Sequence, residues 1–525
     1  MDKEKKAGIK KKIKQGLTYS ATQRTIVILL LVGQLLFIGY MVVSLERYSI
    51  RLQIFFQLLA GLMCIYLINR STKSEFKISW LALMVVFPLY GAVIYFFLSN
   101  QYMTRLIRKS YASKFESTKK WLVQDEMVDE SLKRTDMDVY RYSHYMNSYA
   151  GYPIQQNSEV TYFKSGEEKH PVMLEELKKA RHYIFIEMFI LAQGSMWDEI
   201  LEVLTEKVKQ GVEVRLLYDG MGSSALLPRK YDKKLREIGI KASVFQPFTP
   251  FLSSIQNNRD HRKIIVIDGH TGFTGGDNFA DEYVNRIVRF GYWKDTAVMI
   301  KGQAVWNLTM MFLQMWEVNR PTELVADYDK YKPELHMRKK YESDGYVLPY
   351  GDSPLDNEDV GMLTYLSIIN SAKDYCYIST PYLIPGEEML SALCFAAKRG
   401  VDVRVIVPGI PDKWYVKVLG ESYYKQLIEA GIRLYEYNGF NHAKMFVSDD
   451  IKATVGTINL DHRSFSLHFE DACFLYNMPA VMDVKADFEH MFKNECRELT
   501  LDDCNNRKLY RRMCAGAIKI IEPML

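Results

Sequence analysis

Hydrophobic positions along this chain follow two different patterns. Before residue 100 they form long runs, and beyond about residue 150 they form short apolar strands that alternate with stretches of helical spacing. Long apolar runs are typical of membrane helices, whereas alternating strands and amphipathic helices are typical of an α/β layered domain. The pattern therefore predicts a membrane region followed by a soluble α/β region.

Three apolar segments before residue 100 are candidates for membrane spans. Residues 25–45 carry no charged side chain over 21 positions, residues 80–98 form a second strong segment, and residues 52–69 form a shorter one between Arg51 and Arg70. A helix needs about 20 apolar residues to cross a bilayer. We expect a transmembrane region at 25–100 with these three spans.

Basic residues flank this region on both sides. The tail 1–24 holds eight Lys or Arg against two acidic residues, a net charge of +6, and further Lys and Arg follow residue 100. Basic flanks are normally cytosolic, but three crossings place the two ends on opposite sides. Either one segment is re-entrant or one basic end lies outside, and we expect the soluble region on the cytosolic side.

Charge and cysteine usage narrow the environment and the partner. The whole chain has a net charge of +5, so the part after residue 24 is close to neutral. A near-neutral soluble region argues against a nucleic-acid groove, and the basic tail suits an anionic lipid surface. The seven cysteines are odd in number and lack Cys-x-x-Cys spacing, which indicates reduced thiols and suits the cytosol.

The soluble region repeats itself. Residues 209–220 (KQGVEVRLLYDG) match residues 398–409 (KRGVDVRVIVPG), and residues 235–245 (LREIGIKASVF) match residues 427–437 (LIEAGIRLYEY). Each match joins the end of a helix, a glycine and an apolar strand in the same order. We therefore expect two α/β repeats that pack as a pseudo-dimer.

These matches also suggest a division of the chain. We place the first repeat at 151–335 and the second at 336–500. A polar stretch at 101–150 is expected to connect the membrane region to the repeats, and a helix is expected at 501–525. The last segment has the composition of a helix that packs on the protein or lies on anionic lipid.

Each repeat carries one His-x-Lys-x-x-x-x-Asp motif. The first copy reads HRKIIVID and the second HAKMFVSD, with Gly-Gly-x-Asn and Gly-Thr-x-Asn downstream. A constant offset of 181 residues separates His261, Lys263, Asp268, Gly275 and Asn278 from His442, Lys444, Asp449, Gly456 and Asn459. One such motif is a weak signal. Two copies in register inside matching repeats make coincidence very improbable.

The motif suits chemistry on a phosphodiester. A histidine and a lysine two positions apart lie on the same face of a strand, so both can point at one bound anion. Two copies would bring together two imidazoles, two ammonium groups that neutralise phosphate oxygens, and two Asn side chains that donate hydrogen bonds. One histidine can attack phosphorus while the other protonates the leaving alcohol and later serves as base. The scheme needs no metal, no metal-ligand spacing is visible, and we expect no cofactor.

The repeated motif and its surroundings resemble the phospholipase D superfamily and, more narrowly, its bacterial cardiolipin synthases. The likeness extends over residues 79–99, Ser379 to Leu390 and Val455 to Glu470. It implies a bacterial plasma-membrane enzyme that forms a phosphatidyl-histidine intermediate from phosphatidylglycerol, releases glycerol, and transfers the phosphatidyl group to a second phosphatidylglycerol. A phospholipase D-type hydrolase, a transfer to another alcohol, a nuclease of the superfamily and a non-catalytic scaffold are the alternatives.

The resemblance also implies roles for individual residues. In the superfamily an acidic residue downstream of each motif orients the imidazole, and Asp295 and Glu470 stand at these positions. Asp268 and Asp449 then become structural supports within the motif. The near symmetry leaves the order of the histidines open, and we take His261 as nucleophile and His442 as general acid and then base. His468 stands where the family usually has Asn.

Overall fold

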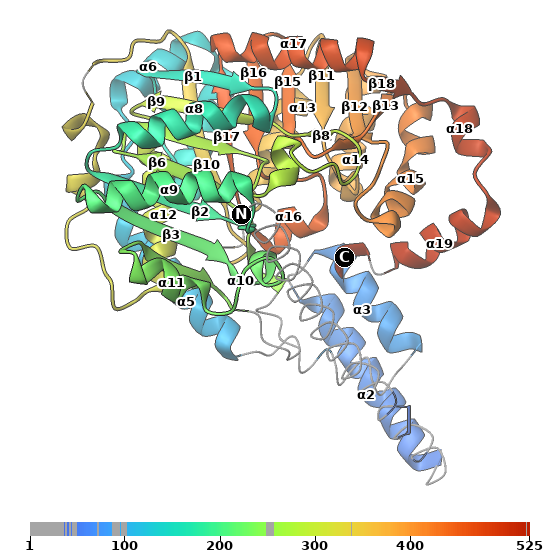
Figure 1. Ribbon diagram of the computed structural model, residues 1–525. Coiled ribbons are helices and arrows are strands. Elements are labelled where there is room, and N and C mark those ends of the chain that lie inside the picture. Colours follow the sequence, from blue (N-terminus) through green and yellow to red (C-terminus); the bar gives the residue numbers. More distant parts are fainter. Residues whose placement is uncertain are drawn as a thin grey trace, which may run out of the picture.

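The computed structural model describes residues 50–70, 73–86, 102–247, 257–337, 339–356, 358–520 and 522–524, together with residues 36, 39, 40, 44 and 95. Two α/β units lie side by side, and a helical hairpin projects from them (Figure 1). The tail 1–24 and nearly all of the predicted span 25–45 lie outside the described residues, as does most of the predicted span 80–98.

The first unit is built on a seven-stranded sheet with the order β1-β9-β7-β6-β2-β3-β4. Strands β2, β3 and β4 are parallel, and the others pair antiparallel. The strands are β1 (Ser158–Phe163), β2 (Tyr183–Met188), β3 (Glu213–Asp219), β4 (Lys241–Phe245), β6 (Lys263–Ile267), β7 (Thr271–Gly275) and β9 (Ala297–Gly302).

The second unit repeats this topology in a nine-stranded sheet with the order β10-β17-β16-β15-β11-β12-β13-β18, in which the ninth strand, β5 (Arg259–Asp260), pairs with β17. Its strands are β10 (Tyr346–Asp352), β11 (Tyr375–Ser379), β12 (Asp402–Pro408), β13 (Arg433–Tyr437), β15 (Met445–Ser448), β16 (Lys452–Gly456), β17 (His468–Tyr476) and β18 (Cys496–Glu498). The first seven occupy the places of the seven strands of the first sheet. The predicted pair of α/β repeats is confirmed.

Helices cover both faces of the first sheet. On one face α8 (Gly166–Lys179) and α9 (Ser195–Lys209) bury Leu177 and Trp197 against alternate residues of β2 and β3. On the other face lies α12 (Val305–Asn319), which is buried on almost every side. Such a helix is expected in the middle of a large core. It packs against β6 and β10, so one continuous core joins the two units.

Further helices complete the two units. In the first unit these are α10 (Gly220–Ser223), α11 (Tyr231–Glu237) and η4 (Asp281–Val284), with η5 (Asp329–Tyr331) and η6 (Pro333–Leu335) after α12. The second unit contains α13 (Val360–Ser371), α14 (Gly386–Lys398), α15 (Trp414–Glu429), α16 (His462–Ser466) and α17 (Pro479–Asn494). Two short pairs of parallel strands connect the units. Strand β5 (Arg259–Asp260) pairs with β17, and β8 (Trp293–Lys294) pairs with β14 (Phe440–Asn441).

The segment between the hairpin and the first sheet is helical and belongs to the core. It forms α5 (Tyr102–Thr118), η1 (Lys119–Trp121), α6 (Glu126–Thr135), α7 (Met137–Tyr145) and a short π-helix, η2 (Met146–Ala150). Tyr111, Leu132 and Met146 are buried in the same cluster as α12. The side chain of Asp136 caps α7 by accepting from the amides of Asp138 and Val139. This stretch is therefore an integral layer of the body as well as a connector.

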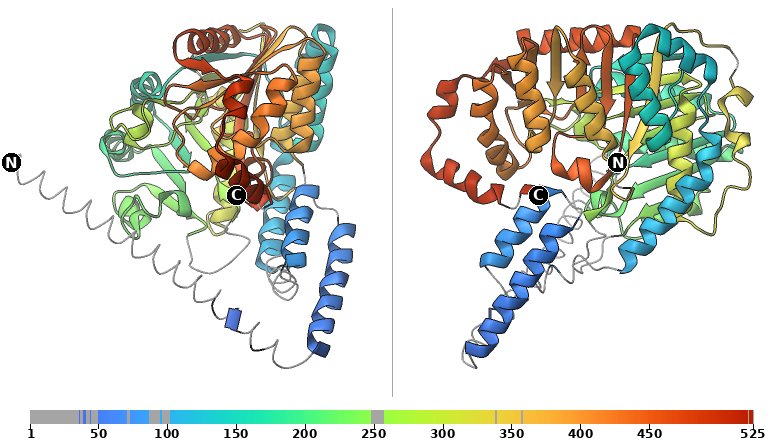
Figure 2. Two further views of the ribbon diagram at one scale, coloured as in Figure 1. Left: turned by 90° about the vertical axis from the view of Figure 1, so that its right-hand side faces the viewer. Right: turned by 180° about the vertical axis from the view of Figure 1, so that it is seen from behind.

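The hairpin consists of α2 (Ile50–Asn69) and α3 (Ser74–Val86), and Figure 2 shows that it extends away from both sheets. Large apolar side chains such as Leu58, Leu62 and Ile65 are exposed on α2. Lys73 anchors the hairpin to the body through a 2.6 Å ion pair with Asp359. The predicted span 52–69 lies within α2. Among the described residues no helix combines the length and the apolar character needed to cross a membrane.

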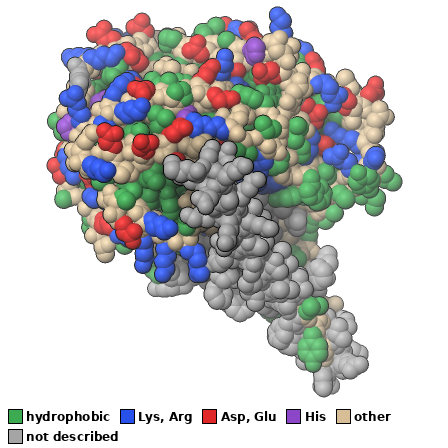
Figure 3. Space-filling view, viewed as in Figure 1, with side chains coloured by type: hydrophobic (Ala, Val, Ile, Leu, Met, Phe, Trp, Pro, Cys, Tyr) green, Lys and Arg blue, Asp and Glu red, His purple; other side chains and the backbone are tan. Residues whose placement is uncertain are grey.

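The C-terminal segment forms two short helices, α18 (Leu501–Asn505) and α19 (Leu509–Lys519), where the sequence predicts one. A break at 506–508 separates them. Helix α19 packs on α15, and the 3-10 turn η7 (Glu522–Met524) contacts α3. Leu509, Tyr510 and Met513 of α19 remain exposed. Figure 3 shows hydrophobic side chains gathered at the right-hand edge of this face of the molecule.

Candidate active site

The two His-x-Lys motifs lie at the start of equivalent strands. Lys263 is the first residue of β6, and Lys444 comes directly before β15. The ammonium of Lys263 donates to the backbone oxygen of His261 at 2.6 Å, and the ammonium of Lys444 donates to the backbone oxygen of His442. All four side chains are buried. The motif thus forms one compact unit in each repeat.

The short strand pairs between the units position both histidines. The amide of His261, just after β5, donates to the carbonyl oxygen of Phe469 in β17 at 2.8 Å. The amide of His442, just after β14, donates to the carbonyl oxygen of Lys294 in β8 at 2.7 Å. Each motif is therefore attached to the backbone of the other repeat.

This attachment exchanges the carboxylates between repeats. Glu470 follows Phe469 and reaches His261, whereas Asp295 follows Lys294 and reaches His442. Both carboxyl groups are fully buried. The site therefore needs both repeats, because neither repeat supplies a histidine and its carboxylate together.

We call the group around His261 the first half-site. Its members are His261, Lys263, Thr457, His468 and Glu470. The imidazole Nδ1 of His261 lies 2.7 Å from Glu470 Oε2, and the Thr457 hydroxyl donates to the same oxygen at 2.5 Å. His468 Nδ1 lies 3.4 Å from the other oxygen, Oε1. Because a carboxylate accepts hydrogen bonds, His261 carries its proton on Nδ1 and directs the Nε2 lone pair away from Glu470.

We call the group around His442 the second half-site. Its members are His442, Lys444, Asp295, Tyr283 and Trp293. His442 Nδ1 lies 2.6 Å from Asp295 Oδ2 and 2.8 Å from the ammonium of Lys444. The rings of Tyr283 and Trp293 pack around the imidazole, with centroids at 5.6 and 5.4 Å. A carboxylate and a lysine thus share one ring nitrogen here, which does not occur in the first half-site.

The two carboxyl groups differ in acidity. Burial raises the pKa of Asp295 to about 6, although the charges of Lys444 and Lys263 act in the opposite direction. Burial also acts to raise the pKa of Glu470, but its interactions with His261 and His468 outweigh this and hold the pKa well below its ordinary range. Glu470 is therefore the more firmly ionised of the two.

Charges from both repeats act on one another in the centre of the site. Burial and the two lysines lower the pKa of His442 well below its usual value, and burial with Lys263 does the same to His261. Burial lowers the pKa of Lys444 to about 7, and Lys263 adds to this effect. A site with two buried, mutually repelling ammonium groups is suited to an anion, which would favour the charged form of both.

The two predicted asparagines are both buried but are used differently. Asn278 accepts from the amide of Ile190 at 2.9 Å and donates to the Tyr283 hydroxyl at 2.7 Å. The Oδ1 atom of Asn459 is buried without a hydrogen-bond partner among the described residues. Asn278 is therefore held in place by its surroundings, whereas Asn459 has hydrogen-bonding capacity in reserve.

Asp268 and Asp449 hold backbone segments together. Asp268 accepts from the amides of residues 181–183 at 2.8 to 2.9 Å, and Asp449 accepts from those of residues 373–375 at 2.8 to 3.0 Å. Both lie in the left-handed region, with φ of 46° and 53°. Asp268 follows Lys263 by five residues of extended chain, a separation of roughly 15 Å. The structure therefore places the motif aspartates at the opposite end of the strand from the histidines.

Three possible metal ligands converge in the first half-site. One ligand atom from each of His261, His468 and Glu470 lies within 4.8 Å of the other two. The sequence shows no metal-ligand spacing here because His261 belongs to a distant part of the chain. The donor set suits a transition metal, but Lys263 is one of the charges that lower the pKa of His261, and Arg463 donates to His468 at 3.2 Å. These positive neighbours fit a phosphate better than a cation.

Sequence reasoning missed four residues of the site: Tyr283 and Trp293, which pack around His442, and also Thr457 and Arg262. Thr457 is the second residue of Gly-Thr-x-Asn, and its counterpart in the first repeat is Gly276, which has no hydroxyl to offer Asp295 and where a Cβ would collide with that carboxylate. Arg262, the variable residue of the first motif, is buried and donates to the backbone oxygen of Glu470 at 3.2 Å and to the Tyr111 hydroxyl at 3.3 Å. The difference between the Gly-Gly and Gly-Thr motifs was a visible signal for Thr457.

The arrangement can carry out a two-step displacement at phosphorus. An unprotonated imidazole with a fixed tautomer can attack, the second imidazole can move a proton, and the lysines can neutralise the phosphate oxygens. The comparisons agree with this chemistry. Residues 173–316 and 365–492 match a family described as "Cardiolipin synthase, PLD-like domain", and residues 58–100 match one described as "Phospholipase_D-nuclease N-terminal".

Bacterial relatives match over most of the chain. A cardiolipin synthase of Alkalihalophilus pseudofirmus is 35% identical over 85% of this chain and 88% of its own length. One from Halalkalibacterium halodurans is 34% identical over 88% and 91%. An uncharacterized protein of Streptococcus mutans serotype c is 44% identical over 88% of this chain and 99% of its own length.

A solved structure has the same fold. The phosphatidylserine synthase of Haemophilus influenzae Rd KW20 superimposes with a TM-score of 0.55 at 15% sequence identity. The match covers 74% of this chain and 98% of that chain. At this identity the likeness concerns the fold alone.

Proposed function

We propose that this protein, a phosphatidyltransferase that belongs to the cardiolipin synthase family of phospholipase D-like proteins, joins two phosphatidylglycerol molecules into cardiolipin and releases glycerol. One observation carries the proposal. Each repeat gives its buried carboxylate to the histidine of the other, which builds one phosphodiester site with two imidazoles and two lysines.

In the first step His261 is the nucleophile. Its Nδ1 proton is held by Glu470, so the Nε2 lone pair attacks phosphorus, and the bond from phosphorus to the glycerol oxygen breaks. Protonated His442 gives its proton to the departing glycerol oxygen. The bound phosphodiester is an anion and favours that protonated form, against the lowering of the His442 pKa by burial and the two lysines.

In the second step His442 is the base. It takes the proton from a hydroxyl group of the second phosphatidylglycerol, whose oxygen attacks phosphorus as the bond to His261 breaks. Lys263 and Lys444 stabilise the charge on the phosphate oxygens throughout. The different neighbours of the two imidazoles support this order, because Nδ1 of His261 has one charged partner and Nδ1 of His442 has two.

The protein would act at the cytosolic face of a bacterial plasma membrane. The exposed apolar side chains of α2, the exposed face of α19 and the predicted spans within 25–98 support a multi-pass membrane anchor. All seven cysteines are free thiols, which supports a cytosolic location for the site. Phosphatidylglycerol and other anionic lipids are the proposed partners.

The test is a product analysis in vesicles. Phosphatidylglycerol labelled in its head group and in its acyl chains is incubated with purified full-length protein. We expect cardiolipin and free glycerol in equal amounts, and neither from His261→Ala or His442→Ala. Phosphatidic acid as the main lipid product would identify a hydrolase instead.

A further inference from the structure

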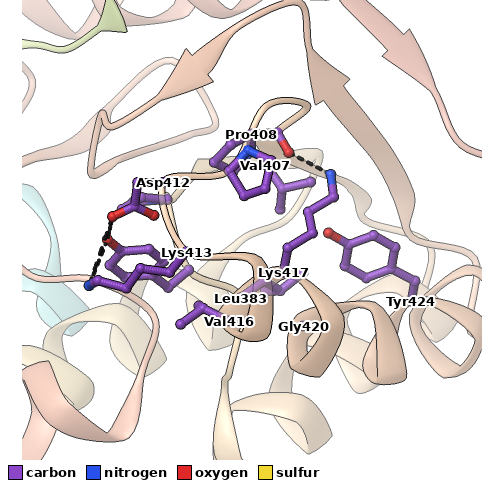
Figure 4. A pocket seen from close by; sticks show the side chains of 12 residues that line it. Leu383, Val407, Pro408, Asp412, Lys413, Val416, Lys417, Gly420 and Tyr424 are labelled. Atoms are coloured by element: carbon purple, nitrogen blue, oxygen red, sulfur yellow. Dashed lines mark hydrogen bonds and ion pairs between the residues drawn. The ribbon is translucent and has the colours of Figure 1, made fainter. Parts of the chain in front are cut away.

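A small pocket with both polar and apolar walls lies near the second half-site, at the carboxyl ends of β11 and β12, and its volume of about 20 Å³ has room for a group the size of a water molecule or one hydroxyl (Figure 4). Tyr382, Asp412, Lys413 and Lys417 provide its polar groups, and Leu383 and Val416 are among its apolar walls. Ligands of α/β proteins bind in crevices outside the carboxyl ends of parallel strands. The position of the pocket is therefore that of a binding site.

The chain that carries Tyr382 passes directly beside the motif. Ser379, the last residue of β11, pairs with Met445, the residue after Lys444. Leu383 then bridges to Leu460, the residue after Asn459. Tyr382 lies within this short path, between the Lys444 strand and the Asn459 segment. Asp412 is near enough for its charge to act on the pKa of His442.

The polar groups of the pocket form a chain of hydrogen bonds. The Tyr382 hydroxyl donates to Asp412 Oδ2 at 2.7 Å, and the ammonium of Lys413 donates to the Tyr382 hydroxyl at 3.2 Å. The Lys413 ammonium also lies 3.8 Å from Asp412 Oδ2, so both partners use the same oxygen, and Oδ1 accepts no hydrogen bond from the described residues. The Asp412 side chain lines the pocket and is 20% exposed. The pocket therefore presents a fixed anionic acceptor.

The first repeat has an apolar residue at the corresponding place. Met188 pairs with Lys263, and Leu191 bridges to Phe279, the residue after Asn278. Ile190 thus stands where the second repeat has Tyr382. Its amide donates to Asn278, and its side chain has no hydroxyl. The acceptor chain of Tyr382 and Asp412 therefore distinguishes the second half-site from the first.

We propose that this pocket binds one free hydroxyl group of a glycerol head group and thereby selects a polyol over a simple alcohol. The inference rests on the proposed function, in which His442 protonates the leaving glycerol and activates the incoming one. The secondary hydroxyl of glycerol donates to Asp412, next to the oxygen that exchanges its proton with His442. A carboxylate is a strong acceptor for such a hydroxyl group. The glycerol that leaves in the first step and the glycerol head group that attacks in the second use the same subsite, because the second step is the reverse of the first.

The two steps are balanced without another reactant. In the first, the phosphorus–oxygen bond to glycerol breaks, a phosphorus–nitrogen bond to His261 forms, and a proton moves from His442 to glycerol. In the second, the hydroxyl of the acceptor returns a proton to His442, its oxygen bonds to phosphorus, and the bond to His261 breaks. Asp412 and Tyr382 stay in their protonation states and act by positioning.

The test compares two acceptors that compete for one intermediate. Vesicles of phosphatidylglycerol are incubated with full-length protein, labelled glycerol and ethanol, and the yields of labelled phosphatidylglycerol and phosphatidylethanol are compared. Because both products come from the same phosphatidyl-enzyme, their ratio reports the acceptor step alone. In Asp412→Asn and Tyr382→Phe we expect the preference for glycerol over ethanol to fall by about tenfold or more, with ethanol transfer kept. Lys425→Gln, on the exposed side of α15, is the matched control.

The outcomes separate this inference from the proposed function. A wild-type protein that transfers to neither alcohol and makes no cardiolipin would overturn both. An active wild type with an unchanged product ratio in Tyr382→Phe, which removes a single oxygen atom, would overturn the glycerol subsite alone. An equal loss of both products in both variants would do the same, since it would show a general role in catalysis or folding.

Discussion

The two half-sites share one motif but differ in what surrounds the imidazole. In the first, Glu470 is ionised, receives a hydroxyl hydrogen bond from Thr457 and is the carboxylate that holds Nδ1 of His261. In the second, Asp295 has a pKa of about 6 and shares Nδ1 of His442 with Lys444. Sequence symmetry therefore does not give chemical symmetry. A fixed tautomer suits a nucleophile, whereas two opposite charges at Nδ1 let the charge of a bound phosphodiester decide whether His442 is protonated, which suits an acid and base.

Removing each imidazole in turn is the strongest test of the difference between the two half-sites. We expect His261→Ala and His442→Ala to lower cardiolipin formation by at least about 10³-fold. A phosphatidyl donor with a p-nitrophenol leaving group needs no proton to depart. With this donor His442→Ala should release one equivalent of p-nitrophenol and remain phosphatidylated, as intact mass after alkaline quenching would reveal.

With the same donor, His261→Ala should form no adduct and give no burst. A phosphatidyl adduct on the His261→Ala protein would reverse the assignment of the two histidines. Lys425→Gln serves as the control for handling and folding.

Exchanging each carboxylate for its amide tests the difference in acidity. We expect Glu470→Gln to lower kcat/KM by roughly 10²- to 10³-fold and Asp295→Asn by about tenfold. The smaller effect follows from the higher pKa of Asp295 and from the second contact that Lys444 makes with His442. Both variants are measured with phosphatidylglycerol across a pH series.

The pH profile gives a second readout of the same difference. Because Asp295 is ionised above its pKa of about 6, wild-type kcat/KM should fall as the pH drops below 6. This decline should persist in Glu470→Gln and disappear in Asp295→Asn. Equal losses in both variants with unchanged profiles would mean that the two half-sites are chemically alike.

The motif aspartates should give the smallest effect on catalysis. Asp268→Asn and Asp449→Asn each weaken hydrogen bonds to three backbone amides far from the imidazoles. We expect Asp268→Asn to destabilise the protein by about 1–2 kcal/mol and Asp449→Asn by less, because Asp268 is buried whereas Asp449 is only partly buried. Thermal unfolding and kcat are compared, and kcat should stay within about threefold of wild type.

A hundredfold loss of kcat without a change in thermal stability would contradict this view. It would give the motif aspartates a part in the chemistry, which their position at the far end of the strand does not support.

Much of the fold and the motif histidines and lysines could be predicted from the sequence. The constant offset of 181 residues identifies two copies of one unit, and the alternation of strands and helices identifies their class. Hydrophobic periodicity reports local structure, so it predicts sheets and helices well. It did not predict that residues 102–150 form a layer of the core, because that burial depends on α12, nearly 200 residues away in the sequence.

Tertiary structure alone decided which carboxylate serves which histidine. Glu470 and His261 are 209 residues apart, and their pairing depends on the short strands β5 and β17 from different repeats. The same strand pairing explains the role of Gly276 and Thr457, which lie next to Asp295 and Glu470. The sequence shows that these two residues differ, but their effect on the site can be understood only once the carboxylate of each histidine is known. Sequence determines the chemical groups of this site, whereas packing between the repeats determines their protonation, because burial and neighbouring charge set the pKa.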